Sequence, residues 1–563
     1  MSYAEAQFTI DEVLNGVKKS YKTGPEPNNL KGIKAVSMAG RVLINFEPVD
    51  TYFKSYAEQE EQMLASVTAI ILRRKIGEYP KDENDGDLVR VFTGPELVAY
   101  KTNPYVDDNL SDDTNYYYRF FICNQNGMMN SNMVNAFMAT PHTPKIWGFH
   151  QDFTVLDPAA TITYIEENEN YTPMMTNCSL GDLSYGSWGQ WQFLKENVPY
   201  DVAKNGTPIK QLNPTNYNYY IDDTPSGFNV SSREGNLFAW LPKIYMKEVY
   251  AEDGNSRDVY FALERDPEIN GDFIPVGFVD VNEQELEGIW LPMNYFDTNV
   301  RNYYNATLAT SGGLNLADAK TQVKNYYGSG RNLGFLGGPI INVLRDLTYL
   351  LYKTTDIQKA AGYGSASYNK TYADDSTIIY QATRGGFIGE GNGTNAASRY
   401  IAKMFHSHVI GQSQRAVRDP YAHIVVQGSS SNYFGMTKNY SEDMTKRFLG
   451  FTDIIPGTSK NSVNTFPARL RYVGDGYGSI PDYSDNSGST TTGLCDQVRA
   501  IARASTSLTY SLMHFGYTNQ DLRAGMASAT IDMADTATCL YGLVIPVLLP
   551  EPGFKPDIVP QEL

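Results

Sequence analysis

The feature that most constrains the fold is the stretch at residues 107–127, DDNLSDDTNYYYRFFICNQNG. An acidic turn leads there into a Tyr-rich segment whose side chains alternate, and the segment closes on Asn-Gly. Alternation with a period of two favours a β-strand, and Asn-Gly is a strong turn signal. The segments Arg41–Val49 and Val67–Phe92 also have the composition of strands. These stretches predict that the N-terminal part of the chain forms one β-unit.

The corner before the Tyr-rich strand resembles that of a fibronectin type III sandwich. Leu110 followed by Tyr116, Tyr117 and Tyr118 is similar to the entry of its F strand, where one Tyr packs inward and ties its hydroxyl to the chain. The order RRKIGEYPKDENDG, YVDDNL and NYYYRF also resembles fibronectin-like modules of bacteriophage tail proteins. The resemblance implies a fibronectin type III-like β-sandwich over residues 31–143 that serves as a spacer or docking piece.

The composition favours several domains built mainly from strands. A chain of 563 residues exceeds one hydrophobic core, and roughly two to four domains are expected. Hydrophobic residues make up 42 %, with 41 Tyr and 25 Phe, which is enough for large cores. Charged residues make up only 19 %, and Gly, Asn, Ser and Thr are abundant, as in chains with many short strands.

Charge and apolar patterning disfavour several functional classes. The net charge of −17 and the lack of a long basic run argue against nucleic-acid binding. No apolar stretch approaches the length of a membrane span, so membrane insertion is not expected. The first residues lack a secretion signal, so synthesis in a cytosol is expected. The four Cys are far apart without CxxC spacing, and the sequence leaves open whether Cys495 and Cys539 pair.

The pattern changes along the chain and predicts four parts. Residues 1–30 form an N-terminal arm and linker with a short helix at Ile10–Lys19, and residues 31–143 form the sandwich. Residues 144–300 form a β-rich region, and residues 301–563 form an α+β region with an insertion near 382–424. The segments with strand patterns in the β-rich region are Ser184–Val202, Asn236–Ala251 and Asp258–Glu264. Helices are predicted at Leu314–Tyr327, Pro339–Ala360 and Leu494–Ala504.

The order of segments after residue 143 carries a second resemblance. GSWGQWQFLK is followed by NLFAWLPKIYMKEVY, by a long apolar helix ending LLYKTTDIQKAAGYG, then by SNYFGM and LYGLVIPVLLP. This order resembles phage tail and minor structural proteins with a C-type-lectin-like domain, related to the formylglycine-generating-enzyme fold. The fold expected is therefore mainly β, with a fibronectin III-like sandwich followed by a C-type-lectin-like α+β part.

The best candidate for a recognition surface is the loop at residues 471–489, RYVGDGYGSIPDYSDNSGS. Exposed aromatic rings stack on the C–H faces of sugars, while Asp and Asn pair with hydroxyls. The alternative is a solvated loop rich in turn-forming Asp and Gly, and a calcium site is a further alternative. The candidate glycan- or receptor-binding residues are Tyr472, Asp475, Tyr477, Asp482, Tyr483, Asp485 and Asn486.

Two other sets of side chains have a functional and a structural interpretation. In a strand, His406 and His408 would share one face, and three such pairs around a threefold axis would form an octahedral site for a transition metal. Trp188 and Trp191 could form a sugar platform, but the neighbouring Phe193 favours a place in the core. No cofactor is expected.

The leading hypothesis is a bacteriophage virion protein of the tail, tail fibre or tip, assembled in the host cytoplasm. It would contact other virion proteins and a host surface glycan or protein receptor, and the resemblance implies a homotrimer. The first alternative is an architectural collar, baseplate or head-decorating protein. The second is a polysaccharide depolymerase, which is disfavoured because no catalytic constellation stands out among the many carboxylates.

Overall fold

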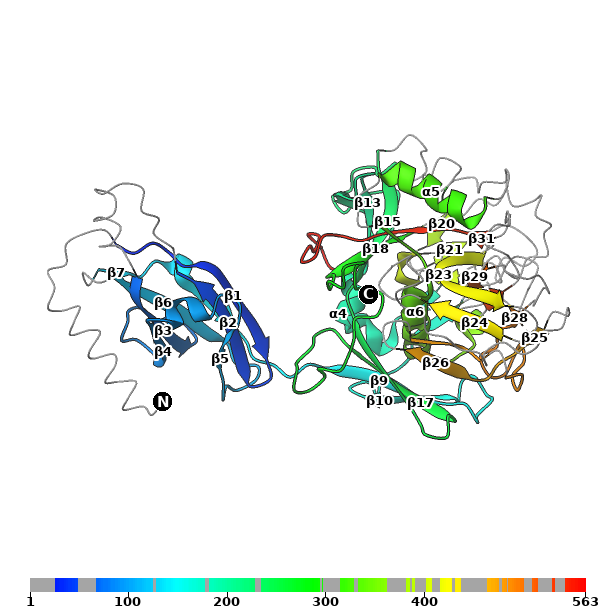
Figure 1. The fold of residues 1–563 in the computed structure, drawn as a ribbon, viewed down its shortest axis with the longest axis horizontal. Coiled ribbons are helices and arrows are strands. Elements are labelled where there is room, and N and C mark those ends of the chain that lie inside the picture. The colour runs from blue at the N-terminus through cyan, green and yellow to red at the C-terminus, as the bar shows by residue number, and fades with distance from the viewer. Residues whose placement is uncertain are drawn as a thin grey trace. The chain divides into compact units, whose positions relative to one another are not determined.

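The computed structural model divides into two compact units. Unit 1 comprises Met1–Pro144 with Asp266–Gly271, and unit 2 comprises Lys145–Arg265 with Asp272–Leu563 (Figure 1). The structure describes residues 26–48, 67–124, 128–177, 182–227, 234–293, 296, 314–328, 333–361, 381–384, 387–389, 401–402, 404–407, 416–427, 431–436, 463–474, 478–482, 485–500, 509–514, 529–531 and 542–563.

Unit 1 is built from two antiparallel sheets with strand orders β1-β2-β5 and β4-β3-β6-β7. Strand β8 also belongs to the second sheet and pairs with the first residues of β6, Tyr116–Arg119. Its elements are β1 (Lys31–Met38), β2 (Arg41–Glu47), β3 (Val67–Ile76), β4 (Asp87–Thr93), α3 (Glu96–Ala99), β5 (Tyr105–Asp107), β6 (Tyr116–Asn124), β7 (Met129–Asn130), η1 (Met133–Asn135) and β8 (Ala136–Ala139).

Aromatic side chains join the two sheets of unit 1. Phe46 of β2 packs against Phe92 of β4 and Phe120 of β6, with ring centroids 4.8 and 5.0 Å apart. The Tyr-rich strand predicted from the alternation is confirmed, because β6 buries Tyr118 and Phe120 completely. The hydroxyl of Tyr116, at the start of β6, accepts a hydrogen bond of 3.0 Å from the backbone N–H of Ser111.

Unit 2 contains a four-stranded sheet, β10-β9-β17-β16, a six-stranded sheet, β14-β13-β15-β18-β32-β19, and a third large sheet around β23 and β29. Its elements are β9 (Ile146–Asp152), β10 (Ile162–Glu166), β11 (Met175–Asn177), β12 (Asp182–Ser184), η2 (Gly186–Gln190), α4 (Gln192–Glu196), β13 (Val198–Val202), β14 (Pro208–Gln211), β15 (Asn236–Pro242), β16 (Tyr245–Tyr250), β17 (Ser256–Ala262), β18 (Gly288–Pro292), α5 (Leu316–Tyr327), β19 (Leu333–Phe335), α6 (Gly338–Tyr352), α7 (Ile357–Ala361), β20 (Gln381–Arg384), β21 (Phe387–Gly389), β22 (Ile401–Ala402), η6 (Met404–His406), β23 (Ala416–Gln427), β24 (Ser431–Met436), β25 (Val463–Thr465), β26 (Leu470–Gly474), β27 (Gly478–Pro481), β28 (Val498–Ala500), β29 (Thr509–His514), β30 (Ala529–Ile531), β31 (Gly542–Leu543) and β32 (Pro546–Leu548).

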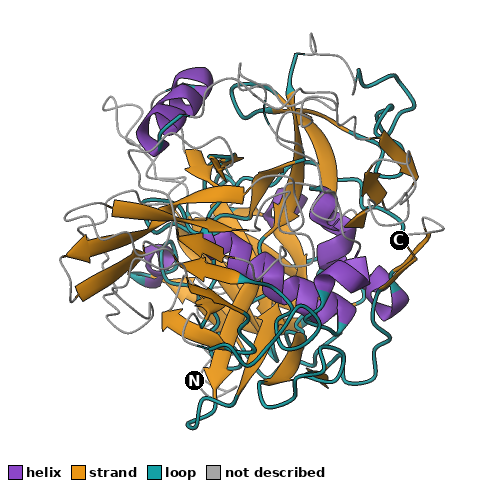
Figure 2. Cartoon of the chain, turned by 90° about the vertical axis from the view of Figure 1, so that its right-hand side faces the viewer, coloured by secondary structure: helices purple, strands orange, loops and turns teal. Residues whose placement is uncertain are grey.

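Helix α6 lies at the centre of unit 2. All of its residues are buried, and Figures 1 and 2 show it running through the middle of the unit with strands around it. Pro339 occupies its first turn, where the missing N–H costs no hydrogen bond. The helix ends at Lys353, which has a left-handed backbone with φ of 53°. This buried helix brings its few polar side chains against strands from distant parts of the chain.

The predicted class, a mainly β chain with few helices, is confirmed in the described residues. The helix at Leu314–Tyr327 is confirmed as α5, and the one at Pro339–Ala360 is confirmed as α6 and α7 with a break between them. The predicted arm and its helix at Ile10–Lys19 lie outside the described residues, as does most of the segment 382–424.

Two of the helix and strand segments predicted along the chain are wrong. The helix expected at Leu494–Ala504 is replaced by β28, because Val498–Ala500 pairs with β25 on one side and β30 on the other. Cys495, with φ of 60°, also interrupts any helix there. The strand pattern expected over Ser184–Val202 holds only for its ends, because η2 and α4 occupy the middle. Trp188 is fully buried there and Trp191 nearly so, so their predicted place in the core is confirmed.

The last residues lie along unit 2 as an irregular segment. The side-chain amide of Gln561 donates to the carbonyls of Leu194 and Asn197, at 2.7 and 2.8 Å, and Lys555 pairs with Glu196 at 2.8 Å. Among the helices that the structure describes, none is long and apolar enough to cross a membrane.

Candidate functional site

The predicted recognition loop forms the hairpin of β26 and β27 and the turn after it. Tyr472 lies in β26, and the residue is 37 % exposed. Asp482, Asp485 and Asn486 follow β27. The other predicted members, Asp475, Tyr477 and Tyr483, lie outside the described residues.

Asp485 and Asn486 hold this loop against the segment before β26. One carboxylate oxygen of Asp485 accepts from the backbone N–H groups of Ala468 and Arg469, at 2.7 and 3.0 Å. The side-chain oxygen of Asn486 accepts from the N–H of Phe466 at 2.9 Å. These two side chains therefore have a structural role within the loop, which the turn-forming interpretation of the sequence anticipated.

Tyr472 borders a small hollow on the surface of unit 2. Its ring lies 6.0 Å from that of Tyr250, measured between centroids. The hollow has a volume of about 40 Å³. The lining residues come from β16, from the hairpin of β26 and β27, and from the loop before β18: Met246, Lys247, Glu248, Asp272, Ile274, Val276, Tyr472, Gly474 and Gly478.

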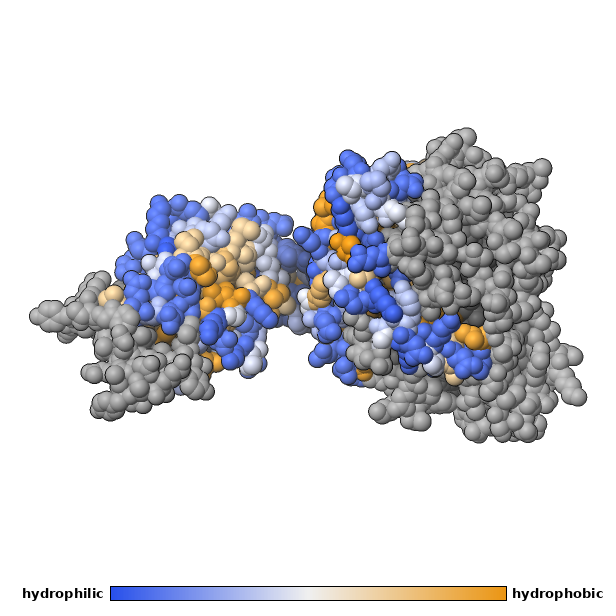
Figure 3. Space-filling view, turned by 90° about the horizontal axis from the view of Figure 1, so that it is seen from above, coloured by the Kyte–Doolittle hydropathy of each residue, from blue (hydrophilic) through white to orange (hydrophobic). Residues whose placement is uncertain are grey.

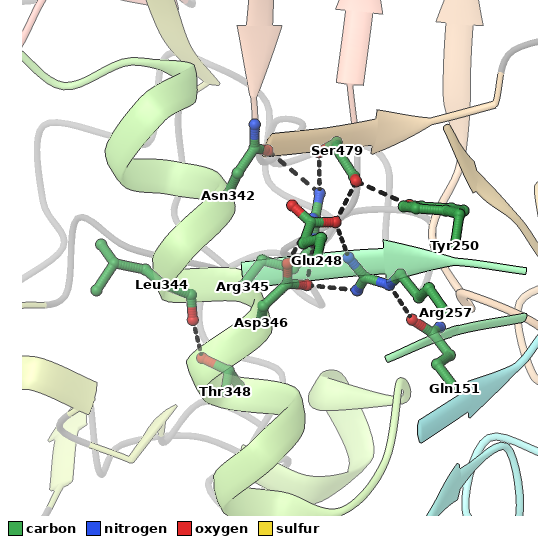
Figure 4. A network of polar contacts seen from close by, with 10 residues as sticks. All are labelled: Gln151, Glu248, Tyr250, Arg257, Asn342, Leu344, Arg345, Asp346, Thr348 and Ser479. Atoms are coloured by element: carbon green, nitrogen blue, oxygen red, sulfur yellow. Dashed lines mark hydrogen bonds and ion pairs between the residues drawn. The ribbon is translucent and has the colours of Figure 1, made fainter. Parts of the chain in front are cut away.

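The floor of this hollow is the edge of a buried ion-pair network, drawn in Figure 4. Arg257 of β17 forms a double ion pair with Asp346 of α6, with N–O distances of 2.6 and 3.1 Å. The same guanidinium donates to Glu248 of β16 at 2.7 Å and to Gln151 of β9 at 2.9 Å. Neither Arg257 nor Asp346 has any exposed side-chain area.

Arg345, the neighbour of Asp346 in α6, extends the network towards the hairpin. Its guanidinium donates to both oxygens of Asp346 at 3.0 Å and to the backbone carbonyl of Ser479 at 2.8 Å. The hydroxyl of Ser479 donates to Glu248, so the hydroxyl of Tyr250, 2.7 Å from Ser479, acts as the donor to Ser479. Two arginines and two carboxylates thus share one buried cluster.

The two carboxylates have opposite environments. Burial alone would raise the pKa of Asp346, but Arg257 and Arg345 outweigh it and hold this pKa below its usual value. For Glu248 burial dominates, and the nearby charge of Asp346 adds to it, so its pKa is raised despite Arg257. Glu248 is therefore the member of the cluster that takes up a proton first on acidification.

Glu248 is also the member that reaches the hollow. Its side chain is only 3 % exposed, and its Oε2 atom accepts from Arg257 and Ser479. Its Oε1 atom has no hydrogen-bond partner among the residues that the structure describes, and Figure 4 shows it pointing away from Arg257. Asp272, the other acid at the hollow, is exposed at the rim and paired with Lys247 at 2.7 Å.

Part of this network could have been predicted from the alternation of inward and outward residues in two strands. In β16 the inward face carries Met246, Glu248 and Tyr250, and in β17 it carries Arg257 next to buried Val259. Opposite charges at inward positions of neighbouring predicted strands indicate a buried ion pair. The third partner, Asp346, could not be predicted, because the apolar stripe of its helix indicated only that the helix packs in the core.

Of the two histidines of the predicted metal pair, the structure describes His406. His406 lies in the short helical turn η6, so the strand geometry predicted for it is wrong. Phe405 and His406 both have positive φ there, and the turn packs against β13 and β15. The ring of His406 is buried, with Nδ1 2.6 Å from the Tyr217 hydroxyl and Nε2 3.2 Å from the Gln561 side chain. His408 lies outside the described residues.

The cysteines of the described residues are buried thiols. Burial raises the pKa of Cys123 to about 12, and it also raises the pKa of Cys495. Thiolates at these positions are therefore disfavoured at neutral pH. Cys539, the predicted neighbour of Cys495, lies outside the described residues. Within the described part of the chain, no group of three or more His, Cys, Asp and Glu side chains is placed to hold a metal ion.

The chain was compared with known families and with curated proteins. No family model matches the chain, and no curated protein matches it either.

The raised pKa of Glu248 predicts a pH dependence of stability with a definite sign. Between the ordinary pKa of an unfolded Glu and the raised folded value, the folded state holds a proton that the unfolded state has released, so lowering the pH stabilises the fold. Glu248→Gln cannot titrate. We expect the unfolding free energy of the wild type, relative to Glu248→Gln, to increase as the pH falls from 7 towards about 4.5.

Tryptophan fluorescence during urea unfolding measures this difference for unit 2 in the intact chain. All five tryptophans, Trp147, Trp188, Trp191, Trp240 and Trp290, belong to unit 2. If the unfolding free energy of the wild type minus that of Glu248→Gln stays constant or decreases as the pH falls, the assignment of the raised pKa to Glu248 is contradicted.

Proposed function

We propose that this chain is a bacteriophage virion protein of the tail, tail fibre or tip that attaches the particle to the host cell surface. Unit 1 is the docking module and unit 2 carries the recognition surface. The observation that carries the proposal is the corner of unit 1, because it supports the link to fibronectin-like modules of phage tails.

The geometry of unit 1 supports a fibronectin type III-like assignment in two respects. The hydroxyl of Tyr116 is tied back to Ser111, five residues upstream, which is the contact expected of the tyrosine corner. The side chain of Leu110 is buried beside it, and the N–H of Leu110 donates to the carbonyl of Gly40. Three strands in one sheet and a larger second sheet agree with such a sandwich.

The surface of unit 1 supports a docking role. Figure 3 shows apolar area on this unit among hydrophilic residues. The large exposed apolar side chains among the described residues of this unit are Val36, Ile76, Val98, Val106, Met133, Val134, Met138 and Ile269. Apolar area on the surface of a protein marks contacts with other proteins, and we assign these contacts to other virion proteins.

Unit 2 is proposed as a C-type-lectin-like region that contacts a host surface glycan or protein receptor. Tyr472 is an exposed aromatic residue of this unit and lies next to a hollow with a carboxylate floor, a combination that suits polar recognition. A homotrimer on the particle presents several copies, and avidity then compensates for a weak single site. The second candidate is an architectural role, in which the exposed side chains of unit 1 serve contacts within the particle alone.

Binding to intact cells tests the proposal. The labelled full chain is added to a panel of bacterial strains, with and without periodate oxidation of their surface sugars. Saturable binding to a strain that is lost after oxidation is the expected result for a glycan receptor, and binding that survives oxidation indicates a protein receptor. A folded protein that binds no strain would favour the architectural role. Release of reducing ends from the host polysaccharide would indicate a depolymerase.

A further inference from the structure

Among the residues that the structure describes, none donates a hydrogen bond to the Oε1 atom of Glu248, a residue that lines the hollow. The other oxygen of this carboxylate is fixed by Arg257 and Ser479, so the orientation of Oε1 is fixed as well. Buried polar atoms are normally hydrogen-bonded, and an unpaired acceptor beside an opening is a place for a donor from outside. The side chain of Glu248 is only 3 % exposed and lines the hollow, so a donor that enters the hollow can reach Oε1.

A glycine keeps this approach open. Gly478 lines the hollow and has φ of 85°, a conformation that other residues rarely adopt. A Cβ atom at this position would lie 3.0 Å from Oε1 of Glu248. The absence of a side chain at Gly478 therefore leaves the space directly over the acceptor.

The charges around the hollow favour a ligand whose hydrogen-bond donor is uncharged. Arg257 and Arg345 carry two positive charges, which the carboxylates of Glu248 and Asp346 balance. A cationic group would add an unbalanced charge to this buried cluster, and an anionic group would face the carboxylate oxygen. A hydroxyl donates a hydrogen bond without changing the balance.

The residues that line the hollow indicate the size of the inserted group and the apolar character of the ligand around it. Met246, Ile274 and Val276 give it an apolar side, and the partly exposed ring of Tyr472 stands at its edge. A volume of about 40 Å³ admits a hydroxyl or hydroxymethyl group and not a whole sugar ring. A ligand with hydroxyls and an apolar C–H face, lying on the ring with one group inserted, satisfies both surfaces.

We propose that the hollow binds a neutral sugar, which inserts one hydroxyl or hydroxymethyl group that donates to Oε1 of Glu248 while its C–H face contacts Tyr472. This inference rests on the proposed attachment function and names the chemistry of its recognition site. It makes Glu248 the acceptor that orients the sugar and Tyr472 the platform that holds it.

Saturation-transfer NMR with the full chain tests the site. The probes are the methyl glycosides of glucose, galactose and N-acetylglucosamine, with glucosamine and glucuronic acid as charged comparators. We expect saturation of at least one neutral glycoside and little of the charged sugars. Glu248→Gln presents an amide in place of the acceptor, and Tyr472→Ala removes the ring, so each variant should weaken binding about tenfold.

Three results would overturn the inference: no saturation of any neutral glycoside, preferred binding of a charged sugar, or equal binding by the wild type and Tyr472→Ala. Tryptophan fluorescence verifies that each variant is folded, and Tyr472→Ala remains decisive if Glu248→Gln does not fold. Cell binding separates this inference from the proposed function. If both variants still attach to cells, the receptor contact lies elsewhere on the protein. If the chain binds a glycoside but no cells, the sugar site is supported and the attachment function is contradicted.

Discussion

Replacing Asp346 with Asn will destabilise unit 2 by about 3 kcal/mol or more, because it removes one partner of a buried ion-pair network. Asp346 accepts from Arg257 at 2.6 and 3.1 Å and from Arg345 at 3.0 Å. Without its negative charge, two enclosed guanidinium groups share Glu248 alone. Asn has nearly the same shape, so the loss measures charge and hydrogen bonding, with little change in packing volume.

Thr348→Val is the matched control for this substitution. Thr348 is buried two residues further along α6, and its hydroxyl donates to the carbonyl of Leu344, four residues earlier (Figure 4). Such a back-bond is worth little, so Thr348→Val should cost less than about 1 kcal/mol. Urea unfolding followed by tryptophan fluorescence reports both variants. A loss for Asp346→Asn no larger than that for Thr348→Val would show that the network does not stabilise the fold.

The ion-pair network that stabilises unit 2 also fixes the orientation of the Glu248 carboxylate at the hollow. A carboxylate that is held by Arg257 and Ser479 cannot turn its free oxygen back into the protein. The network therefore orients the acceptor of the proposed sugar site before any ligand arrives, and preorganisation reduces the entropy that binding costs. Substitutions deeper in the network, such as Asp346→Asn, are expected to affect binding as well as folding.

Elements with a strong local period could be predicted from the sequence. The alternation of β6 and the apolar stripe of α6 are set by neighbours within a few residues, and both elements formed as expected. The segment after Leu494 shows the limit of such patterns. Its residues have a helical spacing of apolar side chains, but pairing of β28 with two strands from elsewhere in the chain overrides that preference.

The candidate site could be predicted only in part for the same physical reason. Tyr472 was found because exposed aromatic residues in a Gly-rich loop have a local signature. Glu248, Arg257 and Asp346 come from three separate elements, and only the packing of α6 against β16 and β17 brings their charges together. Asp485 and Asn486 have the residue types of a binding site, yet their oxygens are used by the backbone of the neighbouring segment.

A second large effect is expected in the six-stranded sheet, at Gly288. This residue begins β18 and pairs with Pro242 of β15. A Cβ atom at position 288 would overlap the buried ring of Trp240 and would lie 2.6 Å from the carbonyl oxygen of Leu241. A backbone oxygen in a sheet cannot move aside as a flexible side chain can, so Gly288→Ala should cost about 3 kcal/mol of unfolding free energy through overpacking.

Two companion variants identify the cause. Glu287→Ala changes the preceding residue, which is half-exposed and pairs with Lys243 at 3.3 Å, and it should cost less than about 1 kcal/mol. Trp240→Phe shortens the ring that the new methyl group meets, so the double variant should be more stable than the sum of the single losses predicts, by about 1 kcal/mol. Urea unfolding monitored by the remaining tryptophans measures all four proteins. Additive losses would place the strain of Gly288→Ala on the Leu241 carbonyl alone, and a loss equal to that of Glu287→Ala would refute the overpacking.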